Sequence, residues 1–109
     1  MPINLQKSII GPKIKIEGNL ISDEEIIIEG IVQGSRVDAG NQPVIVGLGG
    51  VVHADIYGGE IIIYGKVKGN CYGKKSITLG DKSEVIGDLY SPRIDIHPTA
   101  FVSGKLTKK

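Results

Sequence analysis

The chain has 109 residues and a mass of 11.6 kDa, a length that allows one domain. Gly (16), Ile (19) and Val (9) supply about four residues in ten while Pro is only 5, a composition that excludes collagen and intrinsic disorder. The net charge is +1, with four Lys/Arg against six Asp/Glu up to Ala54 and nine against six after it, too balanced for a nucleic-acid-binding face.

The same composition predicts an all-β chain that needs no cofactor. Ala occurs three times and no stretch has helical apolar spacing, whereas β-branched residues come in groups. One Cys and two His leave a metal centre short of ligands within a single chain. No apolar run approaches the ~18 residues of a spanning helix, and none resembles a signal peptide. We therefore expect a cytoplasmic protein that binds neither nucleotide nor nucleic acid.

In chain order, the predicted elements form a repeat. A tail of residues 1–12 precedes a partial first coil, Ile14 to Ile21, and residues 107–109 form a second tail. Between them, alternating apolar pairs recur at spacings of 18, 17, 16 and 17 residues: Ile26/Ile28, Val44/Val46, Ile61/Ile63, Ile77/Leu79 and Ile94/Ile96. Two further apolar columns are Val32, Val52, Val67, Val85, Val102 and Ile56, Cys71, Leu89, Leu106. Arg36 and Val37 are one residue out of step with the last column, which indicates a bulge.

Three apolar columns at a mean period of 17 predict three short strands per coil. Each strand would pair with its equivalent one coil later, about 4.8 Å away. Gly would turn the corners, because it adopts positive φ without steric cost. We therefore predict a single-domain parallel β-helix of about six coils over residues 13–106. The spacing does not fix its handedness.

Outward positions of these strands carry two further patterns. Ile27, Ile45 and Ile62 form an apolar stripe on one outer face. The stripe is either tolerated as stacked aliphatics, covered by the N-terminal tail, covered by a second filament, or placed against a membrane. A second outer column consists of Tyr57, Tyr72 and Tyr90, which we expect to stack as a ladder or to dock a partner.

The ends of such a solenoid need caps, since unpaired strand edges and apolar columns otherwise bind another chain. We expect no cap here: only Thr107, Lys108 and Lys109 follow Leu106, and the first residues are short and interrupted by Pro. We therefore predict end-to-end self-association. The expected contacts are Ile14, Ile16 and Leu20 at the N-end, and Phe101, Val102 and Leu106 at the C-end. The charge split favours joining an acidic N-end to a basic C-end.

Several short motifs, in this order, resemble the bactofilins, which are polymer-forming bacterial cytoskeletal proteins. The motifs are Ile9-Ile10-Gly11-Pro12, Ile16-Glu17-Gly18-Asn19-Leu20, Ile28-Glu29-Gly30-Ile31-Val32-Gln33-Gly34, Gly65-Lys66-Val67-Lys68-Gly69-Asn70, Val85-Ile86-Gly87-Asp88-Leu89 and Val102-Ser103-Gly104. The resemblance implies a right-handed β-helix that forms filaments with non-polar contacts and without nucleotide. It also implies a scaffold at the inner face of the cytoplasmic membrane for cell-shape or wall-remodelling proteins. Ile3 and Leu5 are the candidate membrane tail.

The competing hypothesis is an enzyme of the hexapeptide-repeat type, either an acyltransferase or a carbonic-anhydrase-like trimer. His97 is its candidate catalytic residue, but it occupies a corner position that Gly fills in other coils, so we expect a structural turn there. His53 falls on an outward column and Cys71 on an inward one, where we expect a core residue and not a nucleophile. We therefore predict that the chain is not an enzyme.

Overall fold

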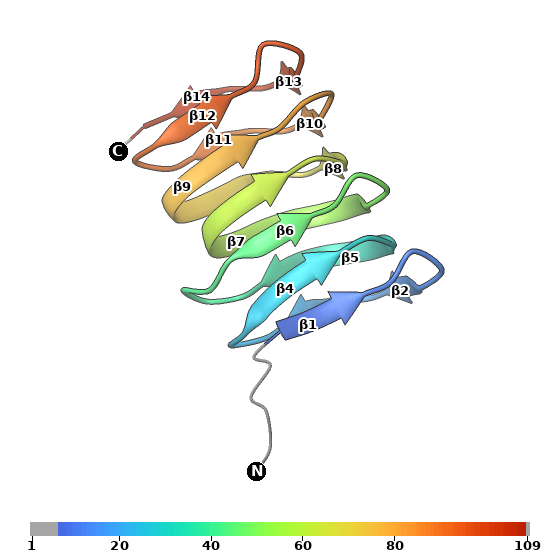
Figure 1. Ribbon diagram of the computed structural model, residues 1–109. Coiled ribbons are helices and arrows are strands. Elements are labelled where there is room, and N and C mark those ends of the chain that lie inside the picture. The colour runs from blue at the N-terminus through green and yellow to red at the C-terminus, as the bar shows by residue number, and fades with distance from the viewer. Residues whose placement is uncertain (1–6, 109) are drawn as a thin grey trace.

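The computed structural model describes residues 7–108, which form one stack of parallel coils with the two ends of the chain at opposite ends of the stack (Figure 1). Between residues 7 and 108 there is no helix that could cross a bilayer. The strands are β1 (Lys7–Ile10), β2 (Lys15–Glu17), β3 (Leu20–Ile21), β4 (Glu25–Ile28), β5 (Ile31–Asp38), β6 (Val44–Val46), β7 (Val51–Ile63), β8 (Lys66–Lys68), β9 (Cys71–Leu79), β10 (Glu84–Ile86), β11 (Leu89–Tyr90), β12 (Ile94–Ile96), β13 (Phe101–Ser103) and β14 (Leu106–Thr107).

Each coil contributes a short pairing segment to each of three faces, as the sequence predicts. The first face holds β1, β4, β6, β12 and the last residues of β7 and β9; the second holds β2, β8, β10, β13 and the first residues of β5 and β7; the third holds the remaining segments. On the first face the strands of six successive coils pair in register. One aligned column there consists of Ser8, Ile26, Val44, Ile61, Ile77 and Ile94. The predicted parallel β-helix and its period are confirmed.

Two details concern the early coils. The register between β5 and β7 shifts between Gln33 and Arg36, which confirms the bulge expected there. We expected residues 7–10 to belong to a tail, but they form β1, which pairs in parallel with β4. The first coil therefore begins before residue 13. The physical reason is the period of the repeat. Ile10 lies 18 residues before Ile28, so it aligns with Ile28 one coil nearer the N-end and is buried in the same inward column.

The interior is a single apolar cluster made almost entirely of Ile, Val and Leu. Cys71 is one of its members, stacked between Ile56 and Leu89, which confirms the expected core position. Burial raises the pKa of the Cys71 thiol to about 12, so the reactive thiolate is scarce at neutral pH.

The corner between the second and third faces depends on a glycine column. Gly69, Gly87 and Gly104 have φ values of 150°, 151° and 152°. A Cβ at any of them would overlap a backbone carbonyl oxygen of the coil below. Both the φ and the close approach of successive coils therefore exclude other residue types here.

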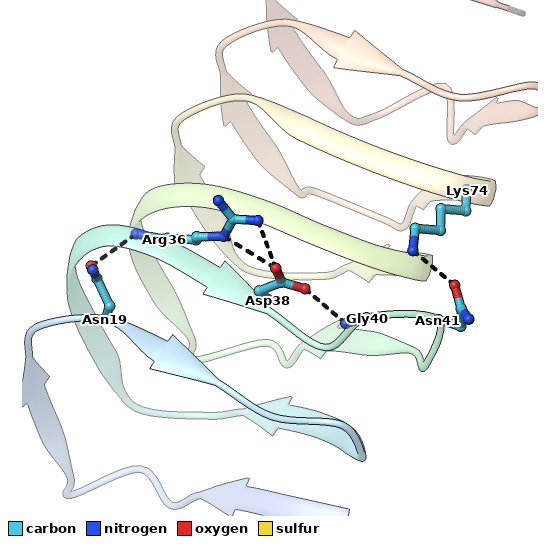
Figure 2. Close-up of polar contacts among 6 residues, drawn as sticks. All are labelled: Asn19, Arg36, Asp38, Gly40, Asn41 and Lys74. Carbon is cyan, nitrogen blue, oxygen red and sulfur yellow. Dashed lines mark hydrogen bonds and ion pairs between the residues drawn. The ribbon is translucent and has the colours of Figure 1, made fainter.

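Side-chain oxygens at the same corner link one coil to the next. The Oδ1 atom of Asp55 accepts a hydrogen bond from the backbone N–H of Asn70 at 2.9 Å. The Oδ1 atom of Asn70 accepts one from Asp88 in turn, and Asp88 Oδ1 accepts one from Lys105, each at 2.9 Å. In the early coils Asn19 Oδ1 accepts hydrogen bonds from the backbone N–H groups of Ser35 and Arg36. Figure 2 shows the bond from Arg36. In each of these bonds the side-chain oxygen accepts from a backbone N–H of the next coil toward the C-end, so the series of bonds has a direction.

Candidate assembly surfaces

The N-end of the solenoid presents apolar side chains that the expected contacts include. Ile16 aligns with Val32 and Leu20 with Val37, so both lie at the open end of inward columns. Ile14 is 48% exposed beside them. The structure thus brings Ile14, Ile16 and Leu20 together on one end face.

The C-end presents a similar face, with Phe101 at its side. Val102 and Leu106 close their inward columns, and Leu106 is 46% exposed. Phe101 aligns instead with Glu84 on an outward column, so it lies on the side of the last coil, 55% exposed. Ile96 ends the inward column of the first face that contains Leu79, and it is 40% exposed.

The sequence reasoning therefore missed one residue at each end. Ile10 and Ile96 belong to the same inward column as Ile28 and Leu79. Their spacing from those residues, 18 and 17, was the available signal.

The two ends differ in charge. Residues 7–25 contain three basic residues, Lys7, Lys13 and Lys15, against four acidic ones, Glu17, Asp23, Glu24 and Glu25, a net charge of −1. Residues 93–108 contain three basic residues, Arg93, Lys105 and Lys108, against Asp95, a net charge of +2. The N-end is therefore slightly acidic and the C-end basic.

The predicted apolar stripe is present on the first face and is longer than expected. Ile27, Ile45 and Ile62 pair in register and are partly buried, and Ile9 precedes them in the same column at 59% exposure. Thr78 then continues the column with a polar side chain. Because Ile9 and Ile10 lie in β1, they extend the stripe or the core and do not cover it as a tail. Ile3 and Leu5 lie outside the described residues.

The tyrosine column on the third face is a stacked ladder, as expected. The ring centroids of Tyr57 and Tyr72 are 4.7 Å apart at 9°, and those of Tyr72 and Tyr90 are 4.9 Å apart at 3°. The guanidinium of Arg36 lies 4.2 Å from the centroid of the Tyr57 ring. Asp38 fixes that guanidinium through its Oδ2 atom, at 2.8 Å from Nη2 (Figure 2).

The Asp38 carboxylate also bonds to the backbone beyond the end of β5. Its Oδ1 atom accepts a hydrogen bond from the N–H of Gly40 at 2.8 Å. This bond, followed by those from Arg36, lowers the pKa of Asp38.

The residues singled out for possible catalysis lie in structural positions. His97 stands at a corner, where its backbone N–H donates to the carbonyl of Leu79 at 2.9 Å. Its Nδ1 atom is 2.8 Å from Thr99 Oγ1, which donates to Asp81 at 2.5 Å. His53 lies outward, between Gln33 and Lys68. Within residues 7–108, no group of three His, Cys, Asp or Glu could hold a metal ion.

Comparison with known proteins identifies the family of this solenoid. A family model described as bactofilin, polymer-forming cytoskeletal, matches residues 8–107, from β1 to the end of β14. The chain belongs to the bactofilin family. Bactofilins are structural proteins of the cytoskeleton that form polymers.

Two curated bactofilins of Myxococcus xanthus are similar to the chain. BacP is 31% identical over 103 residues, which are 94% of this chain and 42% of BacP. BacO is 32% identical over 102 residues, which are 94% of this chain and 79% of BacO. This bactofilin therefore spans less than half the length of BacP and most of BacO. No solved structure matches it.

Proposed function

We propose that this bactofilin assembles end to end into filaments without nucleotide, and that the filaments act as a cytoplasmic scaffold. The observation that carries the proposal is the pair of apolar end faces. Among the described residues, 7–108, each end face also leaves backbone groups unpaired: β12, β13 and β14 pair on one side only, and so do β1, β2 and β3. Unpaired strand edges beside exposed apolar side chains favour strand addition from another chain.

The magnitudes indicate which forces the junction needs. Full burial of an Ile or Leu side chain contributes about 1.5–3 kcal/mol. With Ile96 40%, Leu106 46% and Ile14 48% exposed, the apolar contacts would contribute roughly 2–4 kcal/mol at a junction that buries all three. Association itself costs about 4–15 kcal/mol. Strand pairing across the junction must therefore add to the apolar contact, at about 0.5–1.5 kcal/mol for each hydrogen bond.

Electron microscopy of the purified protein without nucleotide or metal tests the proposal. Filaments should form, and Val102→Arg should abolish them, because it places a charge at the end of an inward column. Ile86→Arg is the matched control, since Ile86 is 49% exposed on the side of the coil below the last and faces no end. A monomeric wild type, or filaments retained by Val102→Arg, would refute end-to-end assembly.

The same variant reports the polarity of the filament. If like ends join, Val102→Arg blocks only the C-end contact and leaves dimers joined through their N-ends. If unlike ends join, every junction needs a C-end, and the variant is a monomer. Analytical ultracentrifugation separates the two outcomes. The charges of the two ends favour the second, and the family resemblance implies the first.

The isoleucine stripe supports a proposal of its own, that it joins neighbouring filaments side by side. Ile9, Ile27, Ile45 and Ile62 form a continuous apolar line across four coils. Ile45→Glu should convert bundles into single filaments without preventing filament formation. Thr78→Glu, in the same column beyond the stripe, should leave bundles intact. Bundles that survive Ile45→Glu would exclude this face.

Membrane attachment stays a prediction that rests on Ile3 and Leu5. Recruitment of cell-shape or wall-remodelling proteins rests on the family resemblance. Co-sedimentation with liposomes, comparing the full chain with one that lacks residues 1–6, tests the tail. Equal binding by both forms would rule out a contribution from those residues.

A further inference from the structure

A groove of about 440 Å³ runs along the third face beside the tyrosine ladder, and nothing in the proposed filament uses it. It is lined by Tyr72, Gly73, Lys74, Tyr90, Ser91 and Pro92. The groove is hollow because the residue that follows each Tyr is small: Gly73 follows Tyr72, and Ser91 follows Tyr90 in the next coil. The ring edges form one wall, and the corner residues Lys74 and Pro92 form the other.

Tyr72, the middle ring of the ladder, offers this groove its edge and not its faces. The two faces of Tyr72 are covered by Tyr57 and Tyr90, each stacked at less than 5 Å between centroids. A nucleic-acid base therefore has no ring face on which to stack between rungs. The edge of an aromatic ring carries partial positive charge. The exposed wall consequently favours aliphatic groups and anions.

Basic side chains at the rim add to this preference. Lys74 reaches past Gly59 to donate a 2.8 Å hydrogen bond to Asn41 Oδ1, a neutral partner (Figure 2). Lys75 is exposed next to it, in the extra length of chain that bulges opposite Gly59. Within the part of the chain that the structure describes, neither lysine forms an ion pair. Asp38 lies near enough to Lys74 for the lysine charge to contribute to the lowered pKa of Asp38. The two lysines nevertheless leave this corner with an exposed positive charge that is not held in an ion pair.

The groove also contains an unused hydrogen-bonding group. Ser91 is 3% exposed, and its Oγ atom has no hydrogen-bond partner among residues 7–108. A buried hydroxyl without a partner costs free energy that a ligand can recover by bonding to it. The backbone of an extended peptide supplies such donors and acceptors at regular intervals.

We propose that this groove binds a short, extended, acidic segment of a partner protein. An aliphatic side chain of the segment lies between the ring edges and Pro92, its carboxylates face Lys74 and Lys75, and its backbone bonds to Ser91. The charge complementarity singles out an acidic peptide, and the covered ring faces disfavour nucleic acid. This site is present in each subunit, whether or not filaments form.

Selection from a display library of random dodecapeptides on the immobilised full-length protein tests the site. Peptides that bind should be enriched in Asp and Glu around one aliphatic residue. In fluorescence anisotropy, Lys74→Glu combined with Lys75→Glu should weaken the enriched peptide at least about tenfold. The matched control is Lys66→Glu combined with Lys68→Glu, which makes the same charge change on the second face and should alter affinity less than twofold.

Four outcomes would overturn the proposal. They are the absence of enriched peptides, enrichment of basic peptides, equal loss of binding in the control variant, and enrichment of peptides that match Asp23–Ile28 of this chain, which would make a second copy the occupant. Two further probes serve as competitors, a single-stranded oligonucleotide and phosphatidylglycerol vesicles. Displacement of the acidic peptide by either would assign the groove to that class of ligand instead.

Discussion

The glycine column allows a sharp test of how closely the coils must stack. Gly87→Ala places a methyl group where the carbonyl oxygen of Gly69 lies, at a φ of 151° that L-residues rarely adopt. Gly18→Ala is the matched control. Gly18 has a φ of 130°, but a Cβ there would meet nothing within 4 Å, because no coil of residues 7–108 lies beneath it. The two variants thus share the backbone strain and differ in the clash.

The expected difference follows from the bonds near Gly87. Backbone strain of this kind costs about 1–3 kcal/mol in either variant. To relieve the clash, the coils must separate at Gly87, which stretches the 2.9 Å hydrogen bonds from Gly69 N to Ile86 O and from Asp88 N to Asn70 Oδ1. Losing both costs about 1–3 kcal/mol more. Gly87→Ala should therefore lose about 2–6 kcal/mol of a total stability that is typically 5–15 kcal/mol.

Thermal and urea unfolding followed by far-UV circular dichroism measure both variants. To keep assembly out of the comparison, each is made together with Val102→Arg. The Tm of Gly87→Ala should fall below that of Gly18→Ala by several degrees, at about 4 °C or more for each kcal/mol. Equal destabilisation would show that φ alone demands glycine, and that the close stacking of carbonyls is not a constraint.

Three further predictions concern individual residues. Cys71, whose pKa burial raises to about 12, should react with a thiol reagent at pH 8 only as fast as the protein opens; rapid labelling would contradict its place in the core. The pKa of Asp38 is lower in the folded chain than in the unfolded chain, where it is about 3.9. The ionised carboxylate therefore stabilises the fold above that value, and this stabilisation is lost as pH falls through the folded pKa. The Tm difference between wild type and Asp38→Asn should accordingly shrink below about pH 4 and not above it. Tyr72→Leu breaks two stacked pairs and should cost about 1–3 kcal/mol. Since the chain has no Trp and 4 Tyr, the near-UV dichroism of Tyr72→Leu should fall by more than a quarter if the rings are coupled.

The sequence predicts the parts of this structure that repeat. Stacked coils force equivalent residues into columns, so the inward columns, the tyrosine ladder, the bulge at Arg36 and the core position of Cys71 follow from spacing alone. The inward column assigned to Val102 also sets Phe101 outward, because adjacent residues of a strand alternate, and the part of Phe101 in the end contact stays a prediction.

The groove was harder to foresee, because it depends on corners and not on strands. Corners differ in length from coil to coil, as the register shift between Gly58 and Glu60 shows. Lys74 and Asn41 are 33 residues apart, about two coils, and between their coils Gly59 approaches the Asn41 backbone so closely that a Cβ would overlap its carbonyl oxygen. Contacts of this kind require the path of each corner, which a column of aligned residues does not contain.

The arrangement of the coils has a consequence for the scale of the whole filament. In Figure 1 the strands of the first face, from β1 to β12, all lie on the same side of the stack, so the outer surface turns little from one coil to the next. Sheets of many strands usually accumulate twist, and a twisted rod turns any given face away from a flat surface within a fraction of its length. If the junctions between subunits continue this stacking, each face of the filament points to the same side along the whole length of the filament. Contacts too weak to hold one subunit can then act together along the whole length.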